Sequence, residues 1–340
     1  MRVLSLAVWG VVLLLLGGCG SGDNESDRAA LAGAKANASP RHTRALSVTL
    51  DRWHGPPHLG ILMATARGYF ADAGLEVVAT SPATPARPIP YVVERVVDLS
   101  VAQLPQVVMA REKGAPIVAI GSLVSQSTST MVWLKKSHLQ DIPDLKGKTI
   151  GFPGVPFERA FLERVLAERG LASSEVHIKN VNYDLVPALV SGRVDAIFGG
   201  SANLEGVKLQ AMGLEPVITP VEKLGVPAYD ELVVVARRDS ISQNPAAYRR
   251  FMLAVARGAA AAIELPEQAA EVVALSAEGE PFRGSGLAKA QVEATMPLLS
   301  KDGYMDPDEA SQLVTWMKSE GIIGRTLPPA ALLTNAFVKR

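Results

Sequence analysis

The sequence has little of several residues on which common protein functions depend. Its 340 residues include one cysteine and 5% aromatic residues, and 34 Lys and Arg balance 34 Asp and Glu. A single cysteine excludes an intrachain disulfide framework and any metal site built from several cysteines. The zero net charge argues against nucleic acid as the main partner. Hydrophobic residues nevertheless make up 48% of the chain, so it can bury a large core, and its length exceeds that of one typical domain.

Motifs typical of common enzyme classes are also missing. The sequence has no GxGxxG after a predicted strand, no P-loop motif, no HExxH and no GxSxG, so the usual signals for dinucleotides, nucleotides, zinc proteases and serine hydrolases are absent. His54 and His58 lie four residues apart, but Pro56 and Pro57 between them break the helix that would bring both to one face. We therefore predict no metal ion, no cofactor and no catalytic residue.

Residues 1–18 have the pattern of an export signal. One arginine is followed by an apolar run that is shorter than the roughly 20 residues needed to span a membrane. The run ends in Leu-Gly-Gly directly before Cys19, which resembles the lipobox of bacterial lipoproteins. The resemblance implies cleavage before Cys19 and attachment of lipid to it, whereas the alternative is an uncleaved signal anchor. Residues 19–44 are rich in small and polar residues without a hydrophobic period, which predicts a flexible tether.

From residue 45 onward, segments typical of strands alternate with segments typical of helices. Apolar and polar residues alternate over 46–50 as in a strand, whereas 59–73 has the pattern of a helix that ends at Gly74. Residues 232–236 form a run of branched and aliphatic residues, as in a strand buried on both faces. This alternation, without a fixed repeat period, predicts an α/β fold of mostly parallel sheets flanked by helices.

The length of this α/β region predicts two lobes. We assign 45–134 together with 232–340 to lobe 1, and 135–231 to an inserted lobe 2. The chain would then cross between the lobes near Lys135 and Glu231, and the two crossings would form a hinge. Because clefts between domains are preferred sites for small molecules, we expect the ligand-binding site there.

Four blocks of sequence carry a resemblance to a known family. They are RGYFADAGLEV at 67–77, LKGKTIGFPGVP at 145–156, NYDLVPALVSGRVDAIFGG at 182–200 and YDELVVVARRDSI at 229–241. In this order they resemble the NMT1/THI5-like substrate-binding proteins of ABC transporters, over residues 46–338. Within that family the sequence is most similar to the branch that binds pyrimidine precursors of thiamine.

The resemblance implies a fold, a location and partners. The fold would be a two-lobed, periplasmic-binding-protein-like fold of type II with the ligand cleft between the lobes. The protein would be a monomer outside the cytoplasm, anchored to a bacterial membrane through the lipid on Cys19. It would close over a flat heteroaromatic ligand, of the formylaminopyrimidine or hydroxymethylpyrimidine type, and deliver it to an ABC permease and its ATPase.

The resemblance and the ends of the predicted strands together indicate ten ligand-binding residues. They are Trp53, His58, Gln103, Phe152, Tyr183, Asp184, Asn203, Glu205, Tyr229 and Glu231. A buried carboxylate such as Glu205 would pair with the edge of an aminopyrimidine through charge-assisted hydrogen bonds. The turn after Phe152 could instead supply backbone N–H groups to an anion. Glu205 and Glu231 could also only complement helix dipoles, and Tyr183 and Tyr229 could belong to the core.

The chain departs from the family pattern at some of these positions. Arg52 separates Asp51 from Trp53 where the family has an Asp-Trp pair, and residues 199–206 lack both aromatic residues of the corresponding family motif. Each aromatic partner of a stacked ring adds roughly 0.5–1.5 kcal/mol beyond burial. These losses therefore predict a wider or differently shaped pocket.

Three other functions stay open on the sequence. The first is the same receptor role for riboflavin or for a sulfonate- or nitrate-type anion. The second is an enzyme, since eukaryotic members of the superfamily synthesise the thiamine pyrimidine with a cysteine-rich CCCFC iron motif. No cysteine follows Cys19 here, so we favour a receptor over an enzyme. The third is a lipoprotein that uses the fold as a sensor or adhesion module.

Overall fold

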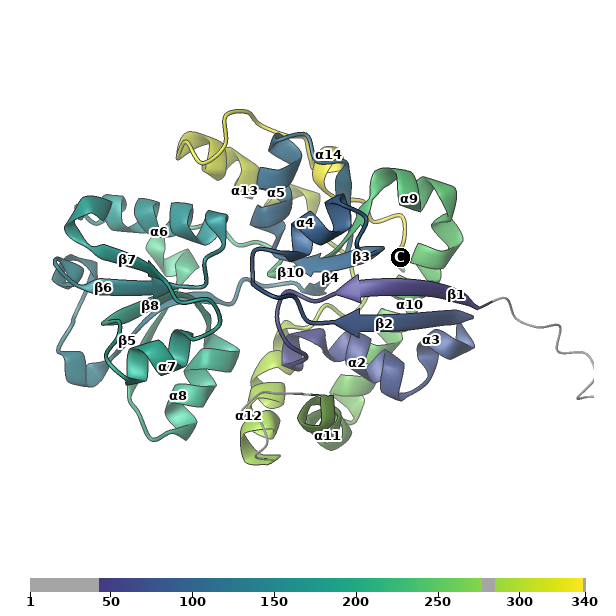
Figure 1. Ribbon diagram of the computed structural model, residues 1–340, viewed down its shortest axis with the longest axis horizontal. Helices are drawn as coiled ribbons and strands as arrows, with labels where there is room; N and C mark the ends of the chain where they lie inside the picture. Colours follow the sequence, from purple (N-terminus) through teal and green to yellow (C-terminus); the bar gives the residue numbers. More distant parts are fainter. Residues whose placement is uncertain (1–42, 277–284, 339–340) are drawn as a thin grey trace, which may run out of the picture. The chain divides into compact units, whose positions relative to one another are not determined.

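The computed structural model describes residues 43–276 and 285–338. The predicted export signal, Cys19 and most of the predicted tether lie outside the described residues. Within the described ranges, no helix combines the length and apolar character needed to cross a membrane. Two five-stranded sheets organise this part of the chain (Figure 1).

The first sheet consists of β1 (Arg44–Thr49), β2 (Leu75–Thr80), β3 (Leu99–Ala102), β4 (Ile117–Val124) and β10 (Leu232–Arg237). Their order across the sheet is β2-β1-β3-β10-β4. β1 pairs in parallel with β2 and β3, whereas β10 is antiparallel to both β3 and β4. Four strands of this sheet therefore run in one direction and β10 runs in the other.

The second sheet consists of β5 (Ser129–Leu134), β6 (Thr149–Phe152), β7 (His177–Asn180), β8 (Ala196–Ser201) and β9 (Pro216–Pro220). Their order is β7-β6-β8-β5-β9. β6 pairs in parallel with β7 and β8, whereas β5 is antiparallel to β8 and β9. The second sheet thus repeats the pattern of the first, with β5 as its reversed strand.

The α/β fold of mostly parallel sheets is confirmed, but the first predicted lobe boundary is wrong for one strand. β5, which we assigned to lobe 1, belongs to the second sheet. All six of its residues are buried, and such a run looks the same in either sheet, so the sequence could not place it. We therefore propose that lobe 1 comprises 43–124 and 232–338 and lobe 2 comprises 129–224, with crossings at 125–128 and 225–231.

Helices cover both faces of each sheet (Figure 1). The predicted helix over 59–73 is split in two, because Gly68 has a φ of +72° and this left-handed conformation ends the first helix. The longer helices are α2 (Leu59–Ala66), α5 (Leu104–Glu112), α6 (Pro156–Glu168), α10 (Pro245–Glu264), α11 (Pro266–Ser276), α12 (Ser285–Thr295) and α13 (Pro307–Ser319). The shorter ones are α3 (Tyr69–Asp72), α4 (Pro88–Val93), α7 (Leu185–Val190), α8 (Val207–Ala211), α9 (Arg238–Gln243) and α14 (Pro329–Leu332).

Apolar side chains pack in three clusters. One lies within lobe 1 around α2, α10 and α11, and a smaller one lies within lobe 2 around α7 and α8. The third joins both lobes through α5, α6 and α13, where Phe161 packs edge-on against Trp316 with ring centroids 4.9 Å apart. On this side the lobes share a core.

The packing of α2 against α10 fixes the position of the loop that precedes α2. Gly258 of α10 lies so close to Gly60 of α2 that a Cβ on Gly258 would collide with the Gly60 carbonyl. Only a residue without a side chain permits this approach. Residues 51–58, which connect β1 to α2, are thereby held at the end of the first sheet.

Candidate functional site

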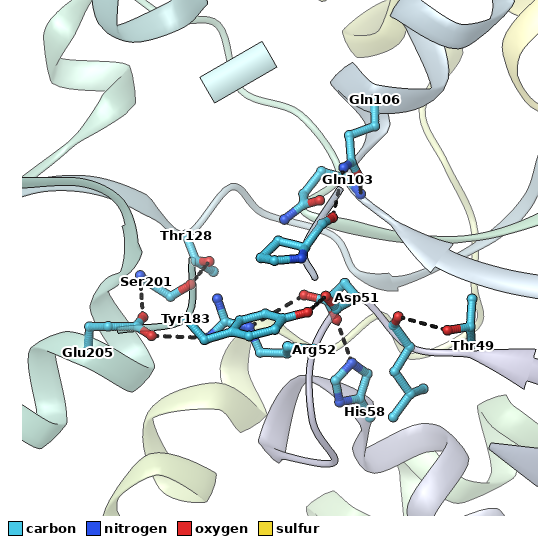
Figure 2. A network of polar contacts seen from close by, with 12 residues as sticks. Thr49, Asp51, Arg52, His58, Gln103, Gln106, Thr128, Tyr183, Ser201 and Glu205 are labelled. Atoms are coloured by element: carbon cyan, nitrogen blue, oxygen red, sulfur yellow. Dashed lines mark hydrogen bonds and ion pairs between the residues drawn. The ribbon is translucent and has the colours of Figure 1, made fainter. Parts of the chain in front are cut away.

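The candidate site lies where strands of both sheets end. The loop after β1 carries Asp51, Arg52 and Trp53, and the π-helix η5 (Ala202–Gly206) follows β8 directly. Figure 2 shows Arg52 of the first segment and Glu205 of the second directed toward one another. In open α/β sheets, ligands bind outside the carboxyl ends of the strands, so this is the expected place for a ligand.

Asp51 is held by the buried ring of His58. His58 is fully buried, and its Nε2 donates to Asp51 Oδ1 over 2.6 Å. Burial alone would raise the pKa of Asp51, but the hydrogen bond from His58 and the charge of Arg52 outweigh it and hold that pKa below its usual value. His58 therefore positions Asp51, and Asp51 presents a fixed negative charge beside Arg52.

Arg52 connects the two lobes. Its Nη1 donates to Glu205 Oε1 over 3.1 Å, and its Nε lies 3.5 Å from Asp51 Oδ2. The residue is only 9% exposed. Burial works against its charge, yet the two carboxylates more than compensate and raise its pKa above the usual value. The guanidinium is therefore a buried cation between one carboxylate of each lobe.

Glu205 takes its orientation from the backbone of lobe 2. Its Oε2 accepts a hydrogen bond from the Ser201 N–H over 2.7 Å, and its Oε1 accepts from Arg52. The residue lies in η5, and single π-helical turns of this kind are frequent at functional sites. Both oxygens of this buried carboxylate are thus satisfied by groups of the protein itself.

Two aromatic side chains face each other from the two lobes. The rings of Trp53 and Tyr183 pack edge-to-face with centroids 4.8 Å apart. Tyr183 Oη also donates to the Asp51 carbonyl over 3.0 Å, and burial raises the pKa of this phenol. The pair closes the site on one side.

Two pockets flank Arg52. The aromatic pocket, of about 130 Å³, is lined by Arg52, Trp53, Tyr183, Leu204, Glu205 and Gln291 among others. The polar pocket, of about 10 Å³, is lined by Asp51, Arg52, Gln103, Thr128, Asn203, Leu204 and Glu231 among others. The polar pocket is too small for more than about one water molecule, so the lobes are closed around it.

Glu231 joins the two crossings between the lobes. Its Oε2 accepts from the Thr128 N–H over 2.8 Å, which links residues 125–128 to 225–231. Burial raises the pKa of Glu231 to about 7, although the hydrogen bond from Thr128 lowers it. Burial also raises the pKa of the neighbouring Asp230 to about 7.

Glu158 is a further buried carboxyl group, which was not among the residues predicted from the sequence. It lies in the first turn of α6, and the space beside Gly199, where a Cβ would come 2.7 Å from Glu158 Oε1, is filled by its carboxyl group. Its Oε2 is buried without a hydrogen-bond partner among the described residues. Burial, and then the charge of Glu231, raise its pKa well above the usual value. The available signal was an acidic residue in the first turn of a helix that follows a strand.

The structure brings seven of the ten predicted residues to the two pockets. Trp53, Tyr183, Asp184 and Glu205 line the aromatic pocket, and Gln103, Asn203 and Glu231 line the polar pocket. Neither pocket is lined by the remaining three, which are His58, Phe152 and Tyr229.

These three residues are buried, and among them His58 supports the site directly through its hydrogen bond to Asp51. Tyr229 is only 1% exposed and packs against Phe161, and Phe152 is buried at the end of β6. Asp184 differs in being exposed, and it pairs with Arg193 at 3.5 Å. Asp51 and Arg52 were not among the predicted ligand-binding residues, because the sequence showed them only as part of a family motif. In the structure Arg52 forms ion pairs with Asp51 and Glu205.

No group of three or more His, Cys, Asp or Glu side chains suited to a metal ion occurs in the ranges 43–276 and 285–338. The charged side chains around Arg52 pair with one another and with backbone groups. The arrangement can therefore bind and enclose a small molecule through hydrogen bonds and aromatic contacts.

Comparison with known sequences gives several relatives over most of the chain, among them the following two. A Haemophilus influenzae protein named as a thiamine biosynthesis protein is 32% identical over 283 residues, which are 83% of this chain and 89% of that protein. The formylaminopyrimidine-binding protein of Halalkalibacterium halodurans is 28% identical over 280 residues, or 80% and 84% of the two chains.

Comparison with solved structures supports the fold. The alkanesulfonate-binding protein SsuA from Xanthomonas axonopodis pv. citri, solved with MOPS bound, aligns with a TM-score of 0.67 at 16% identity. The alignment covers 86% of this chain and 99% of that one, so this chain has the two-lobed fold of periplasmic binding proteins. Residues 55–269 match the family model described as NMT1/THI5 like. The chain belongs to the NMT1/THI5-like family.

Proposed function

We propose that this chain is the solute-binding component of an ABC importer and that it binds a thiamine pyrimidine precursor between its lobes. The proposed ligand is of the formylaminopyrimidine or hydroxymethylpyrimidine type. The observation that carries the proposal is the buried carboxylate of Glu205, held beside Trp53 and Tyr183 where strands of both lobes end. The family, and the relative that is named for formylaminopyrimidine binding, support the same ligand class.

The chemistry of the site suits an aminopyrimidine. A carboxylate accepts hydrogen bonds from the exocyclic amino group and from a protonated ring nitrogen, and such charge-assisted bonds are stronger than neutral ones. The edge-to-face pair of Trp53 and Tyr183 offers an aromatic wall to a flat ring, worth roughly 0.5–1.5 kcal/mol per contact beyond burial. Together these groups select for a flat ring with N–H donors on one edge.

The division of these groups between the lobes suits a transport receptor. Trp53 and Asp51 come from lobe 1, whereas Tyr183 and Glu205 come from lobe 2. A ligand that contacts both lobes stabilises the closed arrangement by its differential affinity for it. A permease that recognises the closed arrangement would then distinguish the loaded from the unloaded receptor.

We propose further that the protein is an extracytoplasmic monomer tethered to a bacterial membrane by lipid on Cys19. The sequence pattern before Cys19 supports this proposal. Replacing Cys19 by Ser should move the protein from the membrane fraction to the soluble fraction of lysed cells. Retention of Cys19→Ser in the membrane fraction would refute the anchor.

The ligand is tested by binding and by thermal unfolding with separate probes. Formylaminopyrimidine or hydroxymethylpyrimidine at 100 times its Kd should stabilise the protein by about 2.7 kcal/mol. Glu205→Gln should weaken that binding roughly ten-fold, because it removes one charge-assisted hydrogen bond. Glu215→Gln is the matched control, since Glu215 is an exposed residue of lobe 2 paired with Lys135, and it should leave the affinity unchanged.

Riboflavin and an aliphatic sulfonate are the competing probes. Stabilisation by either of them, without stabilisation by a pyrimidine, would overturn the proposed ligand but leave the proposed role as a transport receptor intact. Mass spectrometry of small molecules released from the purified protein gives an independent identification. A purified protein that releases no small molecule and responds to no probe would argue for the sensor or adhesion module.

A further inference from the structure

Arg52 separates the aromatic pocket from the polar pocket. Together with Leu204 its side chain lines both, and its guanidinium reaches from lobe 1 to Glu205 in lobe 2. Resting on the function proposed above, we propose that this guanidinium is a tethered competitor of the ligand. A ligand with a planar edge of N–H donors then binds by displacing Arg52 from Glu205.

The chemistry of the guanidinium makes it a substitute for such a ligand. It is a planar cation whose N–H donors match the geometry of a carboxylate. The amino group and the adjacent protonated nitrogen of a 4-aminopyrimidine form a planar N–C–N edge with the same donors. Arg52 Cζ also lies 5.6 Å from the centroid of the Trp53 ring, within the range of cation–π attraction. The groups that hold Arg52 are therefore those that a flat cationic ring requires.

Asp51 gives the displaced side chain a counter-ion. Arg52 Nε lies 3.5 Å from Asp51 Oδ2, and Asp51 is itself fixed by His58. An unpaired buried charge is strongly unfavourable, so a competitor that had only Glu205 as a partner could not leave. Because Asp51 stays in place, Arg52 can release Glu205 and remain paired.

The polar pocket holds an acceptor that Arg52 does not satisfy. Asn203 is 5% exposed, and its Nδ2 donates to Thr295 Oγ1, which donates in turn to the Gln291 carbonyl. Because Thr295 donates its proton to Gln291, it accepts from Nδ2, and this fixes the orientation of the Asn203 amide. The acceptor at its other end, Oδ1, is buried without a partner in the described part of the chain. Movement of Arg52 would join the two pockets and open Asn203 to a second donor of the ligand.

The first test uses methylguanidinium, which does not depend on any pyrimidine. Arg52→Ala removes the tethered guanidinium and leaves its place vacant. Millimolar methylguanidinium, far below denaturing concentrations, should then raise the thermal unfolding temperature of Arg52→Ala and leave the wild type unchanged. Arg159→Ala is the matched control, since Arg159 pairs with Glu163 on the exposed side of α6, and it should show no response. An equal response of wild type and Arg52→Ala, or none in either, would overturn the proposal.

The second test measures the affinity for hydroxymethylpyrimidine by calorimetry. Arg52→Met keeps an unbranched side chain in place of the arginine stem but has no guanidinium to compete for Glu205, so it should bind the pyrimidine roughly ten-fold more tightly than the wild type. Weaker or unchanged binding would show that Arg52 is not a competitor. If no variant binds any pyrimidine, the proposed function fails, while the methylguanidinium result still decides the role of Arg52.

Arg52→Lys keeps the inference testable if the uncharged variants do not fold. It retains a positive charge between Asp51 and Glu205 but lacks the planar fork of donors. It should bind the pyrimidine more tightly than the wild type, by a smaller factor than Arg52→Met. Affinity equal to or below that of the wild type would contradict the inference.

Discussion

The two lobes share one strand order but differ in the connections that leave their equivalent strands. In the first sheet the order is β2-β1-β3-β10-β4 and in the second it is β7-β6-β8-β5-β9. β1 corresponds to β6, β3 corresponds to β8, and the reversed strands β10 and β5 correspond to each other. Each reversed strand directly follows a crossing between the lobes, so each crossing leads into an interior strand of a sheet.

The equivalent connections carry different chemistry. After β1 the chain presents Asp51 and Arg52, whereas the turn between β6 and α6 contains no charged residue. After β8 it presents Glu205, whereas the connection after β3 begins with the neutral Gln103, at the N-cap of α5. Arg52 thus comes from lobe 1, and its partner Glu205 comes from lobe 2. Ligand selectivity therefore lies in the connections, while the sheets supply a common frame.

The largest loss of stability should come from a change in residues 51–58, the charged connection between β1 and α2 in lobe 1. His58→Ala leaves Asp51 without its 2.6 Å partner and empties a fully buried position. Breaking a buried pair and creating a cavity should lower the free energy of unfolding by about 3–5 kcal/mol, as measured by urea denaturation. The same substitution at His177, which is exposed on β7 of lobe 2, should cost less than about 0.5 kcal/mol. Equal costs would contradict the asymmetry between the lobes.

The strands and helices of the two sheets were predictable because they depend on local sequence patterns. Alternating and apolar runs indicated the strands, and glycines such as Gly74 indicated the ends of helices. The sheet to which β5 belongs was not predictable, because its buried residues fit either sheet equally well. The break at Gly68 was missed because the apolar pattern continues through it.

The site was predictable only in part, because its contacts join distant residues. Arg52 and Glu205 are 153 positions apart, and no local pattern shows that they meet. The resemblance identified Trp53, Tyr183 and Glu205, all of which line the aromatic pocket. It could not show that Tyr229 is a core residue, because a strand-end aromatic residue fits a cleft or a core equally well.

A pH-dependent effect should come from the link between the two crossings. The pKa of Glu231 is raised from a usual value of 4.5 to about 7, first by burial. Between these values the folded state holds a proton that the unfolded state has released, so this group's contribution makes the protein less stable as pH rises from about 4.5 to about 7. The change is at most roughly 1.4 kcal/mol per pH unit, and it stops above about pH 7.

Glu231→Gln removes this contribution, together with the rise in the pKa of Glu158 that the charge of Glu231 causes. The Gln amide oxygen can still accept from the Thr128 N–H, but it does not titrate. Relative to the wild type, the variant should therefore gain stability between pH 4.5 and 7 and keep a constant advantage above pH 7, as measured by urea denaturation at each pH. Asp230 titrates in both proteins and so cancels in the difference. Glu215→Gln, at an exposed residue of lobe 2, should show no such trend, and a flat difference for Glu231→Gln would refute the assignment.

The smallest effect should come from one hydrogen bond between the lobes. Tyr183→Phe removes the hydroxyl group that donates to the Asp51 carbonyl over 3.0 Å but keeps the ring that packs against Trp53. The free energy of unfolding should fall by about 1 kcal/mol, and Tyr304→Phe, at an exposed residue of lobe 1, should leave it unchanged. Because the lost bond joins the lobes, the ligand-free variant should also open more often, which amide hydrogen exchange over residues 51–53 would detect as faster exchange. If stability falls but exchange at 51–53 is unchanged, Tyr183 stabilises its own lobe rather than the closed arrangement. The ion pair of Arg52 with Glu205 then holds the lobes together without the Tyr183 hydrogen bond.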